Sequence, residues 1–567
     1  MKYDVIFLKG GNQYNYYTTY NDTKTEQAIT DIYNDGGVIC GTSAGLAVLG
    51  DVDFTAESGT VYPYECLENW DNQYVQLADD FLPLLSGVIF DSHFVQRGRF
   101  PRLLGFMANW YNNTVELVTG IGVDDKTALG IDANLQATAF GSGCVNIYYA
   151  NDGNVLSQNT QSLSVDSIAV TQLIAGTSMN LSNFEVIGFD NEIEPSNAQE
   201  TGNYTIYASG GSNRVDQNES LLRDFALNNG KAEDTVLILS GNDQDTAGLY
   251  EDYLNSLGVQ NTEVFPATPV YSDNVALTNA IKNARKFLFV KAEWTHFQSF
   301  LNGANGKLLL EKLDDNQMIS AFIGDNSRYP GKTVVNNYDS PSASYDGLYE
   351  LEEGLGLLNT TVLIPKTYDP AFDASYSQYE NTIAAIPYAM VKDTLSFGVW
   401  LTRNNYIKYQ PQNGESILHA YGKWPVMILT NNGTSGETVS RGVAAENTEV
   451  RMLGGFKKMQ LSVIDSTMAY KMGNTVEEEE DPVSISGMNN KESAEIFAQP
   501  NLNKLHLDWN KASYSCTIYN TQGMMLIKKQ MLHNQATISY PDFPEGIYII
   551  CLEDDLGNIV TRKLFLE

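Results

Sequence analysis

Short apolar runs that end in glycine or polar residues recur along the first part of the chain. Such runs occupy residues 4–8, 38–40 and 88–90. Their length and their boundaries are typical of buried strands. The second run leads into a glycine-bounded segment, and the small residues 46–49 that follow predict a helix. The order strand, tight turn, helix predicts an α/β fold.

A second series of similar runs appears later in the chain. The matching pairs of segments are 284–291 with 2–9, 321–326 with 38–43, and 355–364 with 82–90. We therefore expect a duplicated fold, in which residues 204–475 are a degenerate second copy of residues 1–203. Asn326 stands at the position of Ser43, so the second copy is expected to have lost its chemistry.

The composition changes after Gly473. A run of four glutamates, an aspartate and a proline at 477–482 predicts an extended linker over 476–495, because like charges repel and proline stops helices. Residues 496–567 contain short strands separated by glycine turns, for example at 515–520 and 546–551. This spacing predicts a C-terminal β-sandwich.

The net charge, the length of the apolar runs and the cysteine content of the chain exclude several classes of binding partner. The chain has 567 residues and a formal charge of −34, which makes nucleic acid and anionic membrane surfaces unsuitable partners. Its apolar runs are all shorter than the roughly 18 residues of a membrane-spanning helix, and its first residues do not have the pattern of a signal peptide. Its five cysteines form no C-x-x-C pair, and we expect no metal and no cofactor.

Residues 41–45 have the form G-x-S-x-G, with Ser43 at the centre. Between a strand and a helix, this motif places the serine on a sharp turn with an exposed hydroxyl group. The N–H group of the next residue, Ala44, is then able to bind an oxyanion. Short glycine patterns also occur at ordinary tight turns, so the motif alone leaves both a nucleophile and a plain turn open.

A serine nucleophile needs a base, which is most often histidine. His93 is the one histidine in the first 200 residues, and it follows the apolar run 88–90. It therefore lies at the carboxyl end of a predicted strand, as Ser43 does, and sites in α/β sheets form at such ends. Taken by itself, His93 also fits a structural role.

Three arginines follow this histidine within ten positions, and no other arginine precedes Arg214. They are Arg97, Arg99 and Arg102. Clustered arginines beside a candidate base, in an acidic chain, suit the bidentate capture of carboxylates. The alternative is a solvated helix face.

These segments resemble the cyanophycinases and the related dipeptidase E serine peptidases. The segment 41–45 is similar to the family's nucleophile motif, and residues 93–99 keep its H-F-x-Q-R-G-R core. The turn at 10–13 is similar to the family's G-G-x-Q turn, and residues 120–128 are similar to its G-I-G-[ILV]-D-E-x-T-A stretch. The four motifs keep the family's order over about residues 1 to 200.

The resemblance implies a flavodoxin-like, or glutamine-amidotransferase-like, domain with a mainly parallel sheet and a Ser-His-acid triad. Ser43 would attack, His93 would act as base, and Asp125 would orient the histidine at a position where the family usually has glutamate. The N–H groups of Ala44 and of a residue near Gly11 would bind the oxyanion. The substrate pocket would be formed by Gln13, Asp91, Gln96, Arg97, Arg99 and Arg102, with the arginines holding substrate carboxylates.

The resemblance also concerns the two ends of the chain. Residues 204–240 resemble the opening strand-helix-strand of the family fold, which residues 1–203 lack, so the first domain is expected to be N-terminally incomplete.

Residues 518–523, 544–548 and 563–565 resemble the C-terminal sorting domain of type IX secretion in Bacteroidetes, the alternative being a generic accessory sandwich. That domain implies handling by the type IX machinery and a secreted or cell-surface location. Such export requires a signal, which again suggests an N-terminally shortened product.

The expected function is a secreted serine peptidase that hydrolyses aspartyl or β-aspartyl-arginine peptide bonds. Cyanophycin is the leading substrate, and a different aspartyl peptide is the alternative, because Ser92 stands where some cyanophycinases have glutamine. The alternative function is a non-catalytic cell-surface binding protein built on a degenerate peptidase fold. Labelling by a fluorophosphonate that disappears in Ser43→Ala would favour the enzyme.

Overall fold

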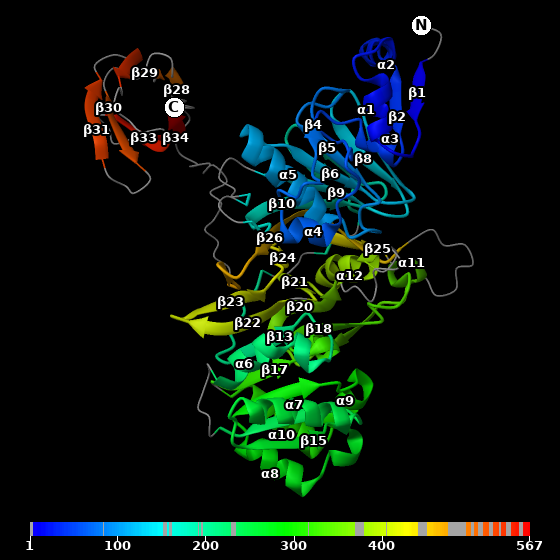
Figure 1. Cartoon of the computed structure of the whole chain (residues 1–567), viewed down its shortest axis with the longest axis vertical. Coiled ribbons are helices and arrows are strands. Elements are labelled where there is room, and N and C mark those ends of the chain that lie inside the picture. Colours follow the sequence, from blue (N-terminus) through cyan, green and yellow to red (C-terminus); the bar gives the residue numbers. More distant parts are fainter. Residues whose placement is uncertain are drawn as a thin grey trace. The chain divides into compact units, whose positions relative to one another are not determined.

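The chain forms two compact units, Met1–Val476 and Glu477–Glu567, which are described separately below (Figure 1). The structure is a computed structural model. It describes residues 4–566 with the exception of residues 83, 151–155, 158–160, 191, 194–196, 228–233, 316, 369–378, 404, 440–450, 474–494, 500–503, 509–513, 521–524, 532–534, 540–545 and 555–558. The linker predicted at 476–495 lies almost entirely outside the described residues.

The largest sheet of the first unit runs through both halves of the expected duplication. In spatial order its strands are β19 (Glu350–Glu353), β18 (Gly331–Asn336), β20 (Leu358–Thr367), β21 (Phe397–Thr402), β24 (Val426–Thr430), β26 (Leu453–Ile464), β10 (Val165–Leu173), β9 (Val145–Tyr149), β6 (Thr119–Val123) and β5 (Val88–Ser92), with β25 (Gly436–Val439) also on β26. β10 and β26 pair antiparallel, side by side in Figure 1. The expected boundary at 203/204 is therefore not a boundary between compact units, because backbone hydrogen bonds join the two halves.

Strand direction in this sheet differs from the mainly parallel expectation. β5–β6, β18–β20 and β20–β21 are parallel, whereas the other neighbouring pairs are antiparallel. Parallel neighbours need a crossover connection, usually a helix. The described connections from β6 to β9 and from β9 to β10 contain hairpins and loops instead, so these strands run antiparallel.

The second sheet of this unit belongs to the second half. Its order is β15 (Thr262–Pro266), β14 (Val236–Ser240), β16 (Lys286–Val290), β17 (Ile319–Phe322), β13 (Thr205–Ser209), β22 (Asn405–Gln412), β23 (Glu415–Gly422) and β27 (Ala469–Lys471). The five strands from β15 to β13 are parallel, as expected, and the last three are antiparallel. β13 thus bridges β17 and β22.

The first half has smaller sheets in the described part of the chain. They are β1 (Val5–Leu8) with β2 (Val38–Gly41), β3 (Asp53–Phe54) with β4 (Leu77–Ala78), and β12 (Val186–Ile187), β11 (Ser178–Asn180), β8 (Gln136–Gly141) and β7 (Thr127–Ile131) in one sheet. The apolar side chains Val5, Phe7 and Val38 are more than half exposed. The sheet of β1 and β2 therefore has a solvent-facing apolar side.

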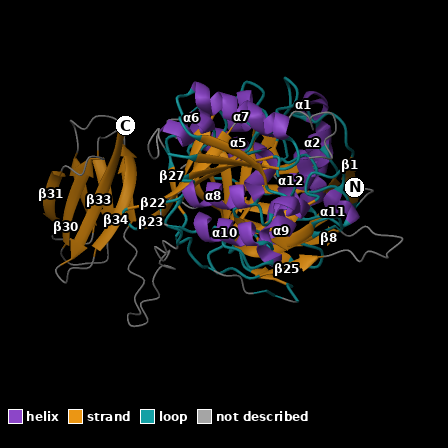
Figure 2. Ribbon diagram, turned by 90° about the horizontal axis from the view of Figure 1, so that it is seen from below, coloured by secondary structure: helices purple, strands orange, loops and turns teal. Residues whose placement is uncertain are grey.

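Helices lie on both sides of the strands of this unit (Figure 2). They are α1 (Tyr14–Tyr20), α2 (Lys24–Asn34), α3 (Ala44–Ala47), α4 (Pro63–Glu68), α5 (Phe100–Thr114), α6 (Glu219–Leu227), α7 (Gln244–Ser256), α8 (Val275–Asn283), α9 (Trp294–Leu301), α10 (Ala304–Leu313), α11 (Ala343–Asp346) and α12 (Tyr379–Lys392). α5 has a proline in its first turn and is followed by the capping residue Val115, whose φ is 64°. Its buried residues 100–110 anchor the end of the loop that follows β5.

The second unit contains two antiparallel sheets. One has β28 (Glu495–Gln499), β29 (Lys504–Asp508) and β32 (Gln535–Ser539), and the other has β31 (Met525–Met531), β30 (Tyr514–Asn520), β33 (Gly546–Asp554) and β34 (Ile559–Leu566). Alternating strands and turns were expected here. The packing of the two sheets as a sandwich stays a prediction.

Candidate active site

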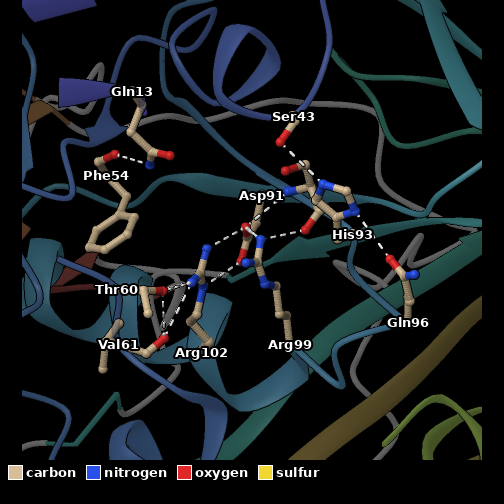
Figure 3. A network of polar contacts seen from close by, with 11 residues as sticks. Gln13, Ser43, Phe54, Thr60, Val61, Asp91, His93, Gln96, Arg99 and Arg102 are labelled. Atoms are coloured by element: carbon tan, nitrogen blue, oxygen red, sulfur yellow. Dashed lines mark hydrogen bonds and ion pairs between the residues drawn. The ribbon is translucent and has the colours of Figure 1, made fainter. Parts of the chain in front are cut away.

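Three turns at strand ends converge on one cavity of 290 Å³. The first follows β1, the second follows β2 and carries Ser43, and the third follows β5 and carries His93. β1 and β2 are parallel, so their carboxyl ends meet at the same edge. Figure 3 shows Ser43 and His93 pointing toward each other beside a cluster of charged side chains.

Ser43 occupies a strained turn between β2 and α3. Its φ and ψ are 52° and −115°, an unfavourable conformation for a residue with a side chain. A Cβ atom on Gly45 would overlap the Leu8 carbonyl group, and one on Gly41 would overlap the Gly45 carbonyl group, so both motif glycines are required by close packing. Ala44 is the first residue of α3, and its N–H group has no acceptor within the helix.

His93 is held between two side chains. Its Nε2 atom lies 3.1 Å from Ser43 Oγ, and its Nδ1 atom lies 3.1 Å from Gln96 Oε1 (Figure 3). Partial burial, followed by the positive charges of Arg97 and Arg99, lowers the pKa of His93. The imidazole is therefore neutral at neutral pH, as a general base must be.

The structure places Gln96, not Asp125, on the ring of His93. One Asp125 oxygen is paired with Arg451 and the other accepts a hydrogen bond from the Tyr345 hydroxyl group. Gln96 reaches Nδ1 because it lies three residues after His93 in the same turn. An amide in this position has a precedent in papain-like proteases, where the orienting residue is asparagine.

Two of the three arginines bind a carboxylate of the protein itself rather than standing ready for substrate. Arg99 Nη1 lies 2.8 Å from Asp91 Oδ1, and Arg102 donates to both Asp91 oxygens at 2.9 and 2.7 Å. Asp91 is 1% exposed. Burial alone would raise the pKa of Asp91, but the charges of Arg102 and Arg99 outweigh it and hold that pKa below its usual value. Asp91, expected to bind substrate, is thus the centre of a buried ion cluster.

The remaining predicted pocket residues border the cavity. Arg97 lines it together with Gly11 and Gln13. Gln13 Nε2 donates to the Phe54 carbonyl group at 2.5 Å, which fixes its side chain (Figure 3). A Cβ atom on Gly10 would lie 3.2 Å from Ser43 Cβ, so the glycine turn packs directly against the serine.

The turn at Asn326, which we expected to match the Ser43 turn, has its side chains engaged in hydrogen bonds. Asn326 donates to the Ala292 carbonyl group at 2.7 Å and accepts from its N–H group at 3.1 Å. Ser327, the neighbouring hydroxyl, is fully buried and donates to the Phe322 carbonyl group at 2.8 Å. Neither side chain is available as a nucleophile.

Residues from the second half reach the site, and the sequence analysis did not include them. Arg451, which precedes β26, contacts Asp124 and Asp125, and the Tyr368 hydroxyl group donates to the Gly98 carbonyl group. A sequence separation of about 270 to 330 residues leaves no local pattern that would have found them.

Comparison with known proteins finds family matches for two regions of the chain. Residues 1–135 match the model of peptidase family S51, and residues 495–567 match the secretion system C-terminal sorting domain. The resemblances predicted from the sequence motifs are confirmed. Because of the sorting domain, the protein is secreted or lies at the cell surface. Among the described helices, none is long and apolar enough to cross a membrane.

Individual relatives match parts of the chain. A cyanophycinase of Geminocystis herdmanii is 30% identical over 169 residues, which are 29% of this chain and 57% of that protein. The chain thus spans little more than half the length of that curated relative. A solved peptidase from an acI-B1 actinobacterium is 13% identical, with a TM-score of 0.31 over 44% of this chain and 98% of that one. A putative peptidase E from Listeria monocytogenes is 10% identical, with a TM-score of 0.28 over 39% and 98%.

Proposed function

We propose that this protein is a secreted serine-type peptidase that hydrolyses aspartyl or β-aspartyl-arginine peptide bonds. Ser43 is the nucleophile, His93 the general base, and Gln96 the residue that orients the imidazole. The single observation that carries the proposal is the 3.1 Å contact between His93 Nε2 and Ser43 Oγ at the wall of a 290 Å³ cavity. The family match of residues 1–135 supports the same reaction class.

The geometry supports acyl transfer in two steps. Ser43 Oγ attacks the substrate carbonyl carbon while its proton passes to His93 Nε2. The carbon–nitrogen bond then breaks, the amine leaves with that proton, and a water molecule activated by His93 hydrolyses the acyl-enzyme. The Ala44 N–H group and one near Gly11 receive the oxyanion, and a preorganised donor of this kind is worth roughly 3–4 kcal/mol.

Positive charge beside the nucleophile supports an acidic substrate. The chain as a whole has a formal charge of −34, yet this cavity is bordered by Arg97, Arg99 and Arg102. Arg97 lines this cavity together with Ser43 and His93, and we assign it to the substrate carboxylate. Cyanophycin remains the leading substrate, with other aspartyl peptides as the alternative.

The test of this function is peptide hydrolysis by the full chain. We expect β-aspartyl-arginine peptides and α-aspartyl peptides to be cleaved, with release of a new amine measured over time. For the α-aspartyl peptides, an isosteric peptide in which asparagine replaces aspartate is the matched substrate control. Absence of hydrolysis, together with absence of fluorophosphonate labelling, would instead favour a non-catalytic binding protein.

Replacing Arg97 by alanine should change substrate preference. We expect kcat/KM for aspartyl peptides to fall about 10- to 100-fold, because a hydrogen bond to a charged group is worth about 1.5–3 kcal/mol. The asparagine peptide should lose less than about threefold. Arg214→Ala, at an exposed ion pair with Asp216, is the control. Equal losses on both peptides would show that Arg97 only supports the structure.

The loss of kcat/KM on acidification should occur at an unusually low pH. Because burial and neighbouring arginines lower the pKa of His93, kcat/KM should fall on acidification with a midpoint below the ordinary histidine value of about 6.5. Arg97→Ala removes a positive charge that disfavours the imidazolium, so its midpoint should move to higher pH. A wild-type midpoint above pH 7, or a shift to lower pH in the variant, would contradict this assignment.

We also propose that residues 204–475 are a second copy of the fold of residues 1–203. The element order supports this, since β6, β7, β8, β9, β10 and β11 have counterparts in β21, β22, β23, β24, β26 and β27. Pairing supports it as well: β5–β6 and β20–β21 are both parallel, and β9–β10 and β24–β26 are both antiparallel. β10 and β26, which join the halves, are then equivalent strands.

A further inference from the structure

Arg451 is a buried charge that is paired with two acidic residues beside the candidate active site. The residue is 0% exposed and stands just before β26. Its guanidinium group is paired with Asp124 and Asp125, the two residues that follow β6, and the Tyr345 ring lies 3.4 Å from its central carbon. A buried charge is tolerated only where it is paired in this way.

These contacts continue to His93 through two further hydrogen bonds. Asp124 Oδ2 binds Arg451, and its other oxygen, Oδ1, accepts the backbone N–H group of Gln96 at 3.3 Å. The Gln96 side chain is the group that holds Nδ1 of His93 (Figure 3). A continuous path of polar contacts therefore runs from Arg451 of the second half to the imidazole of the first.

A second contact from the same half reaches the same loop at another point. Tyr368, which follows β20 and is 1% exposed, donates its hydroxyl hydrogen to the Gly98 carbonyl group. Gly98 belongs to the His93 loop, residues 93–99, and has a φ of 58°. Two separate elements of the second half thus contact the loop, one through Asp124 at Gln96 and the other directly at Gly98.

We infer that Arg451 is a positioning residue for His93. Through Arg451 and Tyr368, the second half holds the His93 loop in the conformation that the reaction requires. The inference rests on the proposed function. It gives the half that lacks a nucleophile a direct part in the reaction of the other half. A displacement of about 1 Å in a reacting group can cost about 100-fold in rate, so a brace of this kind has a measurable effect.

The test compares Arg451→Met with a matched variant that also removes a buried contact between the two halves. Gln172 of β10 donates to the Gly454 carbonyl group at 2.5 Å, and this buried contact joins the two halves without touching the loop. We expect Arg451→Met to lower kcat for peptide hydrolysis about 10- to 100-fold with little change in KM, whereas Gln172→Leu keeps kcat within about twofold. Arg451→Lys should recover little, because an ammonium group cannot hold two carboxylates in the same fork.

A readout that does not depend on turnover separates this inference from the proposed function. Amide hydrogen exchange, followed by mass spectrometry, should become faster over residues 93–99 in Arg451→Met and stay unchanged there in Gln172→Leu. If Arg451→Met does not fold, Tyr368→Phe, which removes one hydroxyl group, is judged by the same criterion. Equal rates of amide hydrogen exchange over residues 93–99 and equal kcat in the Arg451, Tyr368 and Gln172 variants would overturn the inference about Arg451 and Tyr368. An inactive wild-type chain that still shows the exchange difference would overturn the proposed function alone.

Discussion

We expect Ser43→Ala to abolish both peptide hydrolysis and fluorophosphonate labelling. Removing the nucleophile of a serine peptidase costs about 10⁶-fold in kcat, so the residual rate should be close to background. The physical reason is the 3.1 Å contact between Ser43 Oγ and His93 Nε2, the proposed general base. The measurement is peptide turnover together with mass spectrometry of the labelled chain.

The second half supplies the control for that experiment. Ser327→Ala removes the hydroxyl group next to Asn326, the residue that the proposed duplication aligns with Ser43. This variant should leave labelling in place because Ser327 is fully buried. The labelled peptide should contain Ser43 in both the wild-type and the Ser327→Ala chains. Labelling that survives in Ser43→Ala would contradict the assignment of the nucleophile.

Asp91→Asn should destabilise the first unit by about 3–5 kcal/mol, the cost of leaving a buried charge without its partner. Here two guanidinium groups, Arg99 and Arg102, lose their shared carboxylate, and both are less than 10% exposed. The asparagine side chain has nearly the same volume, so the effect reports charge rather than packing. Urea unfolding followed by circular dichroism measures it.

An exposed ion pair calibrates this measurement. Asp216→Asn breaks the pair with Arg214, whose side chains are 57% and 69% exposed. Exposed pairs contribute little to stability, so this variant should unfold almost as the wild type does. If Asp91→Asn behaves like Asp216→Asn, the cluster does not hold the β5–α5 region, and Arg99 and Arg102 become candidates for substrate binding again.

The arginine cluster shows where sequence reasoning reached its limit. Three arginines beside a histidine in an acidic chain indicate an anion, and the sequence contains no sign of which anion it is. Asp91 precedes the cluster in a strand whose five residues are all buried. Its side-chain direction, and therefore its capture of Arg99 and Arg102, depends on the packing of β5 against its neighbours.

The expected contact between Asp125 and His93 is not made, for a related reason. The motif at 120–128 places an acid after β6, and the family resemblance favoured Asp125 as the partner of His93. In the folded chain Asp125 is drawn to Arg451 and Tyr345, which come from the second half. Gln96 takes the contact with Nδ1 because the loop after β5 returns it to the ring. Competition from distant charges has no local signature.

The strand-turn-helix at Ser43, the strand end at His93 and the two regions of family resemblance could all be predicted from the amino-acid sequence. Each depends on neighbours within about ten residues, where backbone sterics and hydrophobic period act directly. The pairing of β10 with β26, which joins the halves in one sheet, could not be predicted in this way. Nor could the contacts of the His93 loop with Tyr368 and, through Asp124, with Arg451. Edge pairing uses backbone groups that every strand carries, and a buried charge pairs with whichever opposite charge the fold brings to it.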